Sequence, residues 1–371
     1  MPVLAAIDVG TNTVRVLVAE AEGPGRFRPL FEDQAITRLG EGFRASRTLG
    51  GEPMRRTIEV AARYADVARA HGAEAIAAVA TAAGREARNG GEFRDALERA
   101  ADLRLELLSG EREAALMLQG VLHGLGLGRE RLLVLDVGGG SAEIVLAADG
   151  RPERLLSVGL GGVALTERYL KSNPPRSWEL VKLEGAIADQ MDALRDRIGD
   201  VRGRLCAGTA GTVTTLAAID MGLREYDARR VNGYRLYRRR LTELYRWLAR
   251  MTLESRRRVP GLEPGRADVI VAGAAIVLQS MDVLGFSELK VSDAGLREGV
   301  LLDLMARVVG PPQLPVTAAV AGAGAPGAAP GGDVVDEGTT SARMAGSMPA
   351  PSRSPAGVVP VGGDSGESLP K

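Results

Sequence analysis

The chain has 371 residues, with 47 basic and 47 acidic side chains and 45% hydrophobic residues. This length exceeds that of one small domain, so two domains are the default expectation. The balanced charge argues against bulk nucleic acid or an anionic membrane as the main partner, because either would require a large positive excess over the whole sequence.

Cysteine and histidine are too scarce for a disulfide framework or a zinc site. The chain has one cysteine, Cys206, and two histidines, His71 and His123, so a divalent cation would have to bind to oxygen ligands. The first residues enter an apolar strand pattern without a basic region and a cleavable apolar stretch, and no run approaches the roughly 20 apolar residues of a membrane span. We therefore expect a cytoplasmic protein without a membrane partner.

An internal repeat, offset by 128 positions, begins near the N-terminus. The first copy reads DVGTNT at 8–13 and continues as VRVLVA, and the second reads DVGGGS at 136–141 and continues as AEIVLA. Each copy follows an apolar run and precedes an alternating run rich in β-branched residues. The pattern predicts two hairpins, each a strand, a tight glycine turn and a second strand.

The segments around these hairpins show mostly helical periodicity. Between the copies it predicts helices over 55–70, 92–101 and 109–125, the last with Ser109 as its N-cap, and a buried strand over 75–81. After the second copy it predicts a strand that leads into GTAGT at 208–212 and helices over 163–170, 178–198, 213–221, 239–251, 266–284 and 294–308. Alternating strands and helices indicate an α/β chain, and the repeated hairpin indicates two similar halves that face each other.

The composition changes after residue 310. Residues 311–371 are rich in proline, glycine and alanine and contain no phenylalanine, tyrosine, tryptophan or isoleucine. Such a segment cannot bury enough apolar surface to offset its ordering entropy, so it is predicted to be a disordered tail. We expect one domain over 1–125 and a second over 126–310.

The glycine turns have the chemistry of a phosphate clamp. Glycines let backbone N–H groups converge on an anion, Thr13 and Ser141 add hydroxyl donors, and the leading carboxylates of Asp8 and Asp136 can hold a metal ion. A hairpin turn without a ligand explains one such sequence, but two copies and a further glycine-threonine turn at 208–212 favour an anion site.

These three turns resemble the phosphate signatures of the superfamily that contains actin, the sugar kinases and the heat-shock chaperone ATPases. More narrowly, seven segments from residue 3 to residue 308 resemble the Ppx/GppA phosphatase family: AIDVGTNTVRVLV, ATAAGREARNG, SGEREAALMLQGV, VLDVGGGSAEIVL, GTAGTVTTLA, GRADVIVAGAAI and VSDAGLREGVLL. The resemblance implies an α/β fold of two ribonuclease H-like domains, of the actin-like ATPase superfamily, with an active-site cleft between them. The chain resembles the short form, without the helical domain that follows in long family members.

The resemblance also implies a catalytic residue. The family's glutamate lies in a Ser-Gly-x-x-Glu-Ala segment, which places it at Glu113, where a carboxylate can orient or deprotonate the attacking water. The alternative, an acid that complements a helix dipole, is retained for Glu111. Arg85 resembles a phosphate-binding arginine of the family.

The remaining site residues follow from the same motifs. The carboxylates expected on the side of a bound Mg²⁺ or Mn²⁺ are Asp8, Asp136 and Glu143. The other expected phosphate-binding residues are Gly10, Thr11, Asn12, Thr13, Gly138, Gly139, Gly140, Ser141, Gly208, Thr209, Gly211 and Thr212.

The family resemblance implies an exopolyphosphatase that releases orthophosphate from linear inorganic polyphosphate. A guanosine pentaphosphate (pppGpp) phosphohydrolase is the alternative, since both substrates present the same terminal phosphoanhydride. A sugar kinase, a polyphosphate-to-nucleotide phosphotransferase and a non-catalytic nucleotide sensor are further alternatives. An arginine-rich stretch over 229–258 fits either a polyanion groove or a solvated helix face, and the family implies a homodimer.

Overall fold

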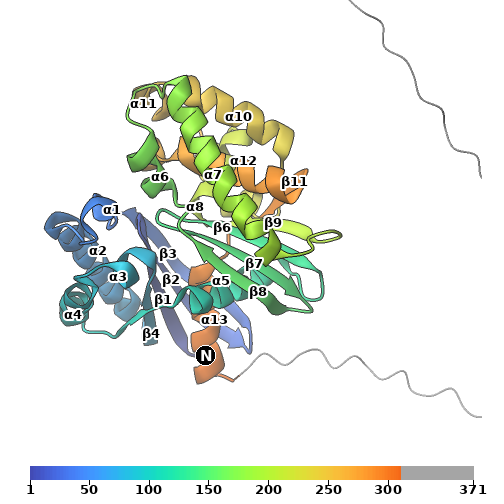
Figure 1. The fold of residues 1–371 in the computed structure, drawn as a ribbon. Coiled ribbons are helices and arrows are strands. Elements are labelled where there is room, and N and C mark those ends of the chain that lie inside the picture. The colour runs from blue at the N-terminus through green and yellow to red at the C-terminus, as the bar shows by residue number, and fades with distance from the viewer. Residues whose placement is uncertain (311–371) are drawn as a thin grey trace, which may run out of the picture. The chain divides into compact units, whose positions relative to one another are not determined.

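The computed structural model describes residues 1–310, and the predicted tail at 311–371 lies outside the described residues (Figure 1). The described chain alternates strands and helices and forms two sheets with helices packed against them. The predicted α/β fold class is confirmed. None of the described helices combines the length and the apolar character that a membrane crossing requires.

The first sheet contains the first repeat. Its strands are β1 (Val3–Val9), β2 (Thr13–Gly23), β3 (Arg26–Ile36), β4 (Ala73–Ala80) and β5 (Leu105–Leu107). Their order is β3-β2-β1-β4-β5, with β1 antiparallel to β2 and parallel to β4. The first predicted hairpin and the strand predicted over 75–81 are therefore confirmed.

The second sheet repeats this topology. Its order is β8-β7-β6-β9-β11, again with the first hairpin antiparallel and the following strands parallel, and β10 is added antiparallel at the edge. The strands are β6 (Leu132–Val137), β7 (Ala142–Ala148), β8 (Arg151–Val158), β9 (Leu205–Thr209), β10 (Arg235–Tyr237) and β11 (Glu288–Val291). Two sheets of the same topology are the arrangement that the repeat predicted.

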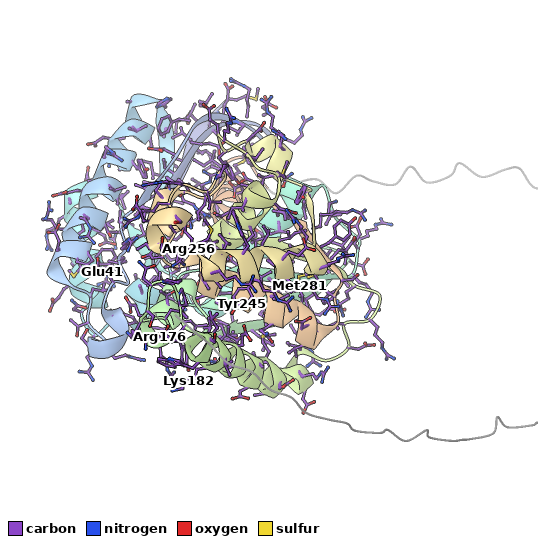
Figure 2. The ribbon with its side chains drawn as sticks, turned by 90° about the horizontal axis from the view of Figure 1, so that it is seen from above. Glu41, Arg176, Lys182, Tyr245, Arg256 and Met281 are labelled. Carbon is purple, nitrogen blue, oxygen red and sulfur yellow. The ribbon has the colours of Figure 1, made fainter. Side chains whose placement is uncertain are left out.

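Helices cover the outer face of each sheet. The first sheet packs against α2 (Gly51–Ala70) and α4 (Gly90–Ala101). The second packs against α8 (Ala210–Asp220) and α12 (Ile270–Leu284), and α6 (Gly162–Tyr169), α7 (Ser177–Ile198) and α10 (Arg238–Arg250) pack in turn on α12. Tyr245, labelled in Figure 2, ties α10 to α7 because its hydroxyl donates to Glu184 Oε1 at 2.6 Å.

Two helices lie between the sheets and contact both halves. They are α5 (Gly110–Leu125), which packs on β7 and β8, and α13 (Leu296–Val308), which packs on β1 and β2 (Figure 1). They also pack on each other so closely that a Cβ at Gly120 would lie 1.8 Å from the Gly295 carbonyl oxygen. Only glycine allows this approach of two backbones, so the last helix of each repeat joins that repeat to the other one.

The predicted helices are confirmed, with small shifts of their ends. Ser109 caps α5 as predicted, because its side chain accepts the Arg112 N–H at 3.1 Å. The segment predicted as a helix over 266–284 instead begins with a 3₁₀ turn at Pro264–Arg266, and its α-helix starts at Ile270. The pattern did not indicate the short helices α1 (Phe43–Ser46), α3 (Ala82–Glu86), α9 (Ala228–Val231) and α11 (Leu253–Arg256).

Candidate functional site

The glycine turns of the two sheets converge on a cavity of about 90 Å³ between the halves, the central cavity. The first turn closes with a hydrogen bond from Gly10 N–H to Thr13 O at 3.0 Å, and the second with one from Gly138 N–H to Ser141 O, also at 3.0 Å. These strand ends meet because β1, β6 and the parallel β9 each end at the edge of a sheet that faces the cleft. The topology thus brings together segments more than 120 residues apart.

Most of the predicted site residues line this cavity. They are Asp8, Gly10, Thr11, Asn12, Thr13, Glu113, Asp136, Gly138, Gly139, Gly140, Ser141, Glu143, Thr209, Gly211 and Thr212. The predicted residues outside its lining are Gly208 and Arg85. A Cβ at Gly208 would lie 2.8 Å from the Leu289 side chain of β11, so this glycine serves close packing of the strands.

Arg85 contacts the predicted catalytic glutamate. Its Nη1 donates to Glu113 Oε2 at 2.8 Å and to the Leu108 carbonyl oxygen at 2.8 Å. Glu113 lies in the first turn of α5 and is 7% exposed. Arg85 therefore holds the orientation of the Glu113 carboxylate in this structure.

Four carboxylates face the central cavity, three of them buried and that of Asp136 partly buried, and desolvation raises the pKa of each. The pKa of Asp8 and that of Asp136 rise from 3.8 to about 6, mainly by desolvation, although the Arg15 charge opposes the shift. Desolvation also raises the pKa of Glu113 from 4.5 to about 7, against the hydrogen bond from Arg85. Burial and the neighbouring carboxylates raise the pKa of Glu143 well above 4.5. Such a cluster holds excess negative charge that a cation can offset.

The cluster offers open oxygen ligands. Asp8 Oδ1 is buried without a hydrogen-bond partner in the part of the chain that the structure describes, whereas Glu143 Oε1 accepts the Ser157 hydroxyl at 2.8 Å. Among residues 1–310 no three acids, histidines or cysteines gather closely enough to form a metal cage. The arrangement fits a small hard cation held by one or two carboxylates and completed by phosphate oxygens and water.

Two arginines of the cavity lining were missed in the sequence. Arg15 lies opposite Asp8 in the pairing of β1 and β2. Arg266 is 8% exposed, and its Nη2 donates to Thr13 Oγ1 at 3.3 Å. A Cβ at Gly211 would lie 2.1 Å from Arg266 Nη1, so the third glycine turn leaves room for this guanidinium. Guanidinium groups beside glycine turns can bind phosphate oxygens.

A wider pocket of about 720 Å³ shares Arg15, Ala210, Gly211 and Arg266 with the central cavity. We call it the front pocket. It is lined by six arginines and five carboxylates, and its arginines are Arg15, Arg224, Arg257, Arg258, Arg266 and Arg297. The central cavity thus opens beside a larger space in which basic groups are slightly in excess.

Only the end of the arginine-rich stretch at 229–258 reaches this front pocket, through Arg257 and Arg258. The arginines at the start of α10 instead form ion pairs with neighbouring acids. Arg238 contacts Asp282, and Arg240 Nε lies 2.5 Å from Asp220 Oδ1. For α10 the structure favours the solvated helix face over a polyanion groove.

Comparisons with known proteins agree on one family. The model of the Ppx/GppA phosphatase family matches residues 17–308. "Exopolyphosphatase 2" of Mycobacterium tuberculosis is 33% identical over 313 residues, covering 81% of this chain and 98% of the relative, and "Exopolyphosphatase 1" of Mycobacterium leprae is 30% identical over 306 residues, covering 81% and 88%. The crystal structure of the Aquifex aeolicus Ppx/GppA family member superposes with a TM-score of 0.71 at 29% identity, covering 83% of this chain and 98% of that one. The predicted fold of two ribonuclease H-like halves is confirmed by this likeness.

Proposed function

Because the chain belongs to the Ppx/GppA phosphatase family, we propose that it is an exopolyphosphatase that removes the terminal phosphate of linear inorganic polyphosphate as orthophosphate. The observation that carries this proposal is the position of Glu113. A buried carboxylate lines the same small cavity as two phosphate-type glycine turns and is held there by Arg85. This arrangement has a water activator and an anion clamp within one space.

In the proposed reaction, Glu113 accepts a proton from the water whose oxygen attacks the terminal phosphorus. The bond between that phosphorus and the bridging oxygen breaks, and the shortened chain leaves with the bond electrons on that oxygen. Backbone N–H groups of the turns at 10–13 and 138–141 stabilise charge on the equatorial phosphate oxygens. A pKa near 7 suits Glu113 to this role, because a base works best when its pKa lies near the working pH.

We propose that Asp8 and Asp136, with Glu143 beside them, hold Mg²⁺ or Mn²⁺. When bound, the cation neutralises phosphate charge and orients the terminal phosphate. The unpartnered Asp8 Oδ1 and the raised pKa values of the neighbouring carboxylates support this assignment, since both mark negative groups that protein donors do not satisfy.

Polyphosphate is favoured over guanosine pentaphosphate by the names of the similar mycobacterial proteins. It is also favoured by the front pocket, whose lining has one more arginine than carboxylates and includes Arg15 and Arg224, which could contact a chain of phosphates beyond the terminal one. A kinase or phosphotransferase would need a second acceptor site for which the sequence has no motif. We further propose that the protein is a homodimer, as the family resemblance implies, and that it is cytoplasmic, as expected from its sequence pattern.

The test compares kcat/KM for long polyphosphate, short polyphosphate and guanosine pentaphosphate, with Mg²⁺ and with or without ADP. We expect free orthophosphate from polyphosphate, the highest kcat/KM on polyphosphate and no ATP when ADP is present. A higher kcat/KM on guanosine pentaphosphate would assign the alternative hydrolase. ATP formation would assign a phosphotransferase, and binding without phosphate release would assign a sensor.

A further inference from the structure

A second pocket, of about 290 Å³, adjoins the central cavity without sharing any lining residue with the front pocket. We call it the rear pocket. Its wall in common with the central cavity consists of Thr11, Gly139, Gly140 and Val163. The three spaces therefore form a series, with the phosphate turns in the middle and a separate pocket at either end.

The partition between the central cavity and the rear pocket is thin. It is made of two glycines and two small side chains, and a Cβ at Gly140 would lie 2.8 Å from Thr11 Oγ1. On its other side Thr11 packs against Gly40, where a Cβ would lie 2.3 Å from Thr11 Cγ2. Glycine from two loops thus surrounds the Thr11 side chain, and a change in its rotamer changes the separation of the two spaces.

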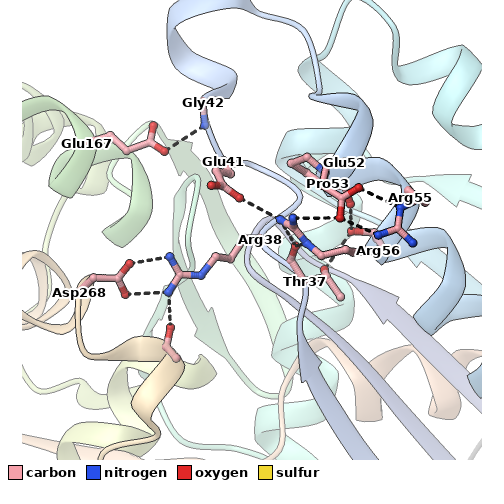
Figure 3. Close-up of polar contacts among 12 residues, drawn as sticks. Thr37, Arg38, Glu41, Gly42, Glu52, Pro53, Arg55, Arg56, Glu167 and Asp268 are labelled. Carbon is pink, nitrogen blue, oxygen red and sulfur yellow. Dashed lines mark hydrogen bonds and ion pairs between the residues drawn. The ribbon is translucent and has the colours of Figure 1, made fainter. Parts of the chain in front are cut away.

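The loop at 37–43 lines the rear pocket through Gly40 and Phe43, and Figure 3 shows the polar contacts of this loop with the second half. Gly42 N–H of this loop donates to Glu167 Oε1 of α6 at 3.1 Å. Arg38 of the same loop forms a bidentate pair with Asp268 of the second half, at 2.7 and 3.2 Å. Opening of the cleft on this side therefore requires these polar contacts to break.

The two ends of the series differ in charge. The front pocket has six arginines against five carboxylates, whereas the charged groups that line the rear pocket, among the side chains that the structure describes, are Arg47, Glu86 and Glu167. Negative charge at the rear opposes entry of a polyanionic chain and weakens retention of a small anion there. Basic groups at the front favour the chain.

Building on the proposed exopolyphosphatase function, we propose that the rear pocket is the exit for orthophosphate. The central cavity, about 90 Å³, is several times the roughly 10–15 Å³ that one water molecule needs, so it accommodates a terminal phosphate while the rest of the chain lies in the front pocket. After cleavage the shortened chain still fills the front pocket. Orthophosphate can then leave without displacing the chain only at the other end, past Thr11.

A pair of matched substitutions tests this route. Ala164→Met narrows the rear pocket, and Ala228→Met places the same side chain in the front pocket. Phosphate formed on the enzyme is measured by acid quench, and free phosphate by a phosphate-binding sensor, during the first turnovers on long polyphosphate. For Ala164→Met we expect normal formation but release about 10-fold slower, since release then limits turnover. For Ala228→Met we expect a raised KM and no delay between formation and release.

Because Ala164 is buried, Glu167→Gln provides a second test that leaves the packing of α6 in place and keeps a side-chain oxygen that can accept the Gly42 N–H. It removes a negative charge at the exit, so we expect added orthophosphate to inhibit about threefold more strongly, with unchanged formation in the first turnover. Coincident formation and release in Ala164→Met, or wild-type inhibition in Glu167→Gln, would overturn the exit. If the wild-type protein formed no phosphate even in the quenched samples, the proposed function itself would fall, and the exit with it.

Discussion

The hairpin of β1 and β2 and the hairpin of β6 and β7 close with the same backbone hydrogen bond, at 3.0 Å in each. They differ in one cross-strand pair of residues near the turn. In the first hairpin Asp8 faces Arg15, whereas at the corresponding register of the second Asp136 faces Glu143. The first half thus places one carboxylate and one guanidinium group at the cleft, whereas the second half places two carboxylates there. The repeated topology positions the two glycine turns, and the change of a single partner places an arginine beside Asp8 and a second carboxylate beside Asp136.

The helices that begin at the cleft show a similar contrast. Both α5 and α13 carry a buried glutamate in the first turn, Glu113 and Glu298. Glu298 accepts the Gly295 N–H at 2.7 Å and the Arg297 guanidinium at 2.6 Å, and its pKa is lowered. Glu113 has one arginine partner, faces the central cavity and has a raised pKa. The difference fits the role proposed for Glu113 as a proton acceptor and identifies Glu298 as a helix cap.

The largest expected effect comes from substituting the two glutamates just compared, Glu113 and Glu298. Glu113→Gln should lower kcat on polyphosphate by about 10³-fold, because an amide cannot accept the proton of the attacking water. Glu298→Gln should keep kcat within about threefold but lower the melting temperature, because it weakens a buried ion pair and a cap. Steady-state kinetics and thermal unfolding measure both. Near-normal turnover of Glu113→Gln would remove the catalytic assignment.

The next largest effect is on the free energy of unfolding in the absence of metal ions, through the carboxyl groups of Asp8 and Asp136. A carboxyl whose folded pKa is about 6, above its ordinary 3.8, contributes stability at low pH that is lost as pH rises through about 6. In EDTA at pH 8, Asp8→Asn and Asp136→Asn should each stabilise the fold by up to about 3 kcal/mol, the equivalent of two pKa units. The gain should vanish near pH 4, where the wild-type carboxyls are neutral.

Saturating Mg²⁺ is the control for this pair of variants. It should stabilise the wild-type protein more than either asparagine variant, because ligand binding to the folded state adds to stability. Asp136→Asn should gain at least as much as Asp8→Asn in EDTA, since it also relieves repulsion with Glu143. Chemical denaturation at several pH values gives the comparison. Equal stability of all three proteins at pH 8 would contradict the burial of charged carboxylates.

The local parts of this site could be predicted from the sequence. The two hairpins, the Ser109 cap and the position of Glu113 in the first turn of α5 are encoded within a few residues each, so pattern and spacing were sufficient. The packing of α13 against the first sheet could not be predicted, because it depends on contacts between the two repeats.

Residues whose role depends on distant partners were either missed or have contacts that the sequence did not indicate. Arg266 bonds Thr13 across 253 positions, and nothing local distinguishes it from the chain's other arginines. Arg15 did carry a signal, because the repeat aligns it with Glu143. Gly208 lies within a phosphate-type motif, yet its open side faces Leu289. Arg85 contacts Glu113, a partner that the sequence did not indicate, and its contact with phosphate stays a prediction.

The smallest expected effect tests the charge difference between the hairpins. Arg15→Gln removes the cation opposite Asp8 and leaves the turn backbone intact. A hydrogen bond to a charged group contributes about 1.5–3 kcal/mol, so kcat/KM on polyphosphate should fall about 10- to 100-fold. Arg239→Gln is the matched control, since Arg239 is exposed on α10 beside Glu243, and it should leave kcat/KM unchanged. Equal losses in both variants would mean that total positive charge, and not the position of Arg15 in the first hairpin, governs binding of the substrate.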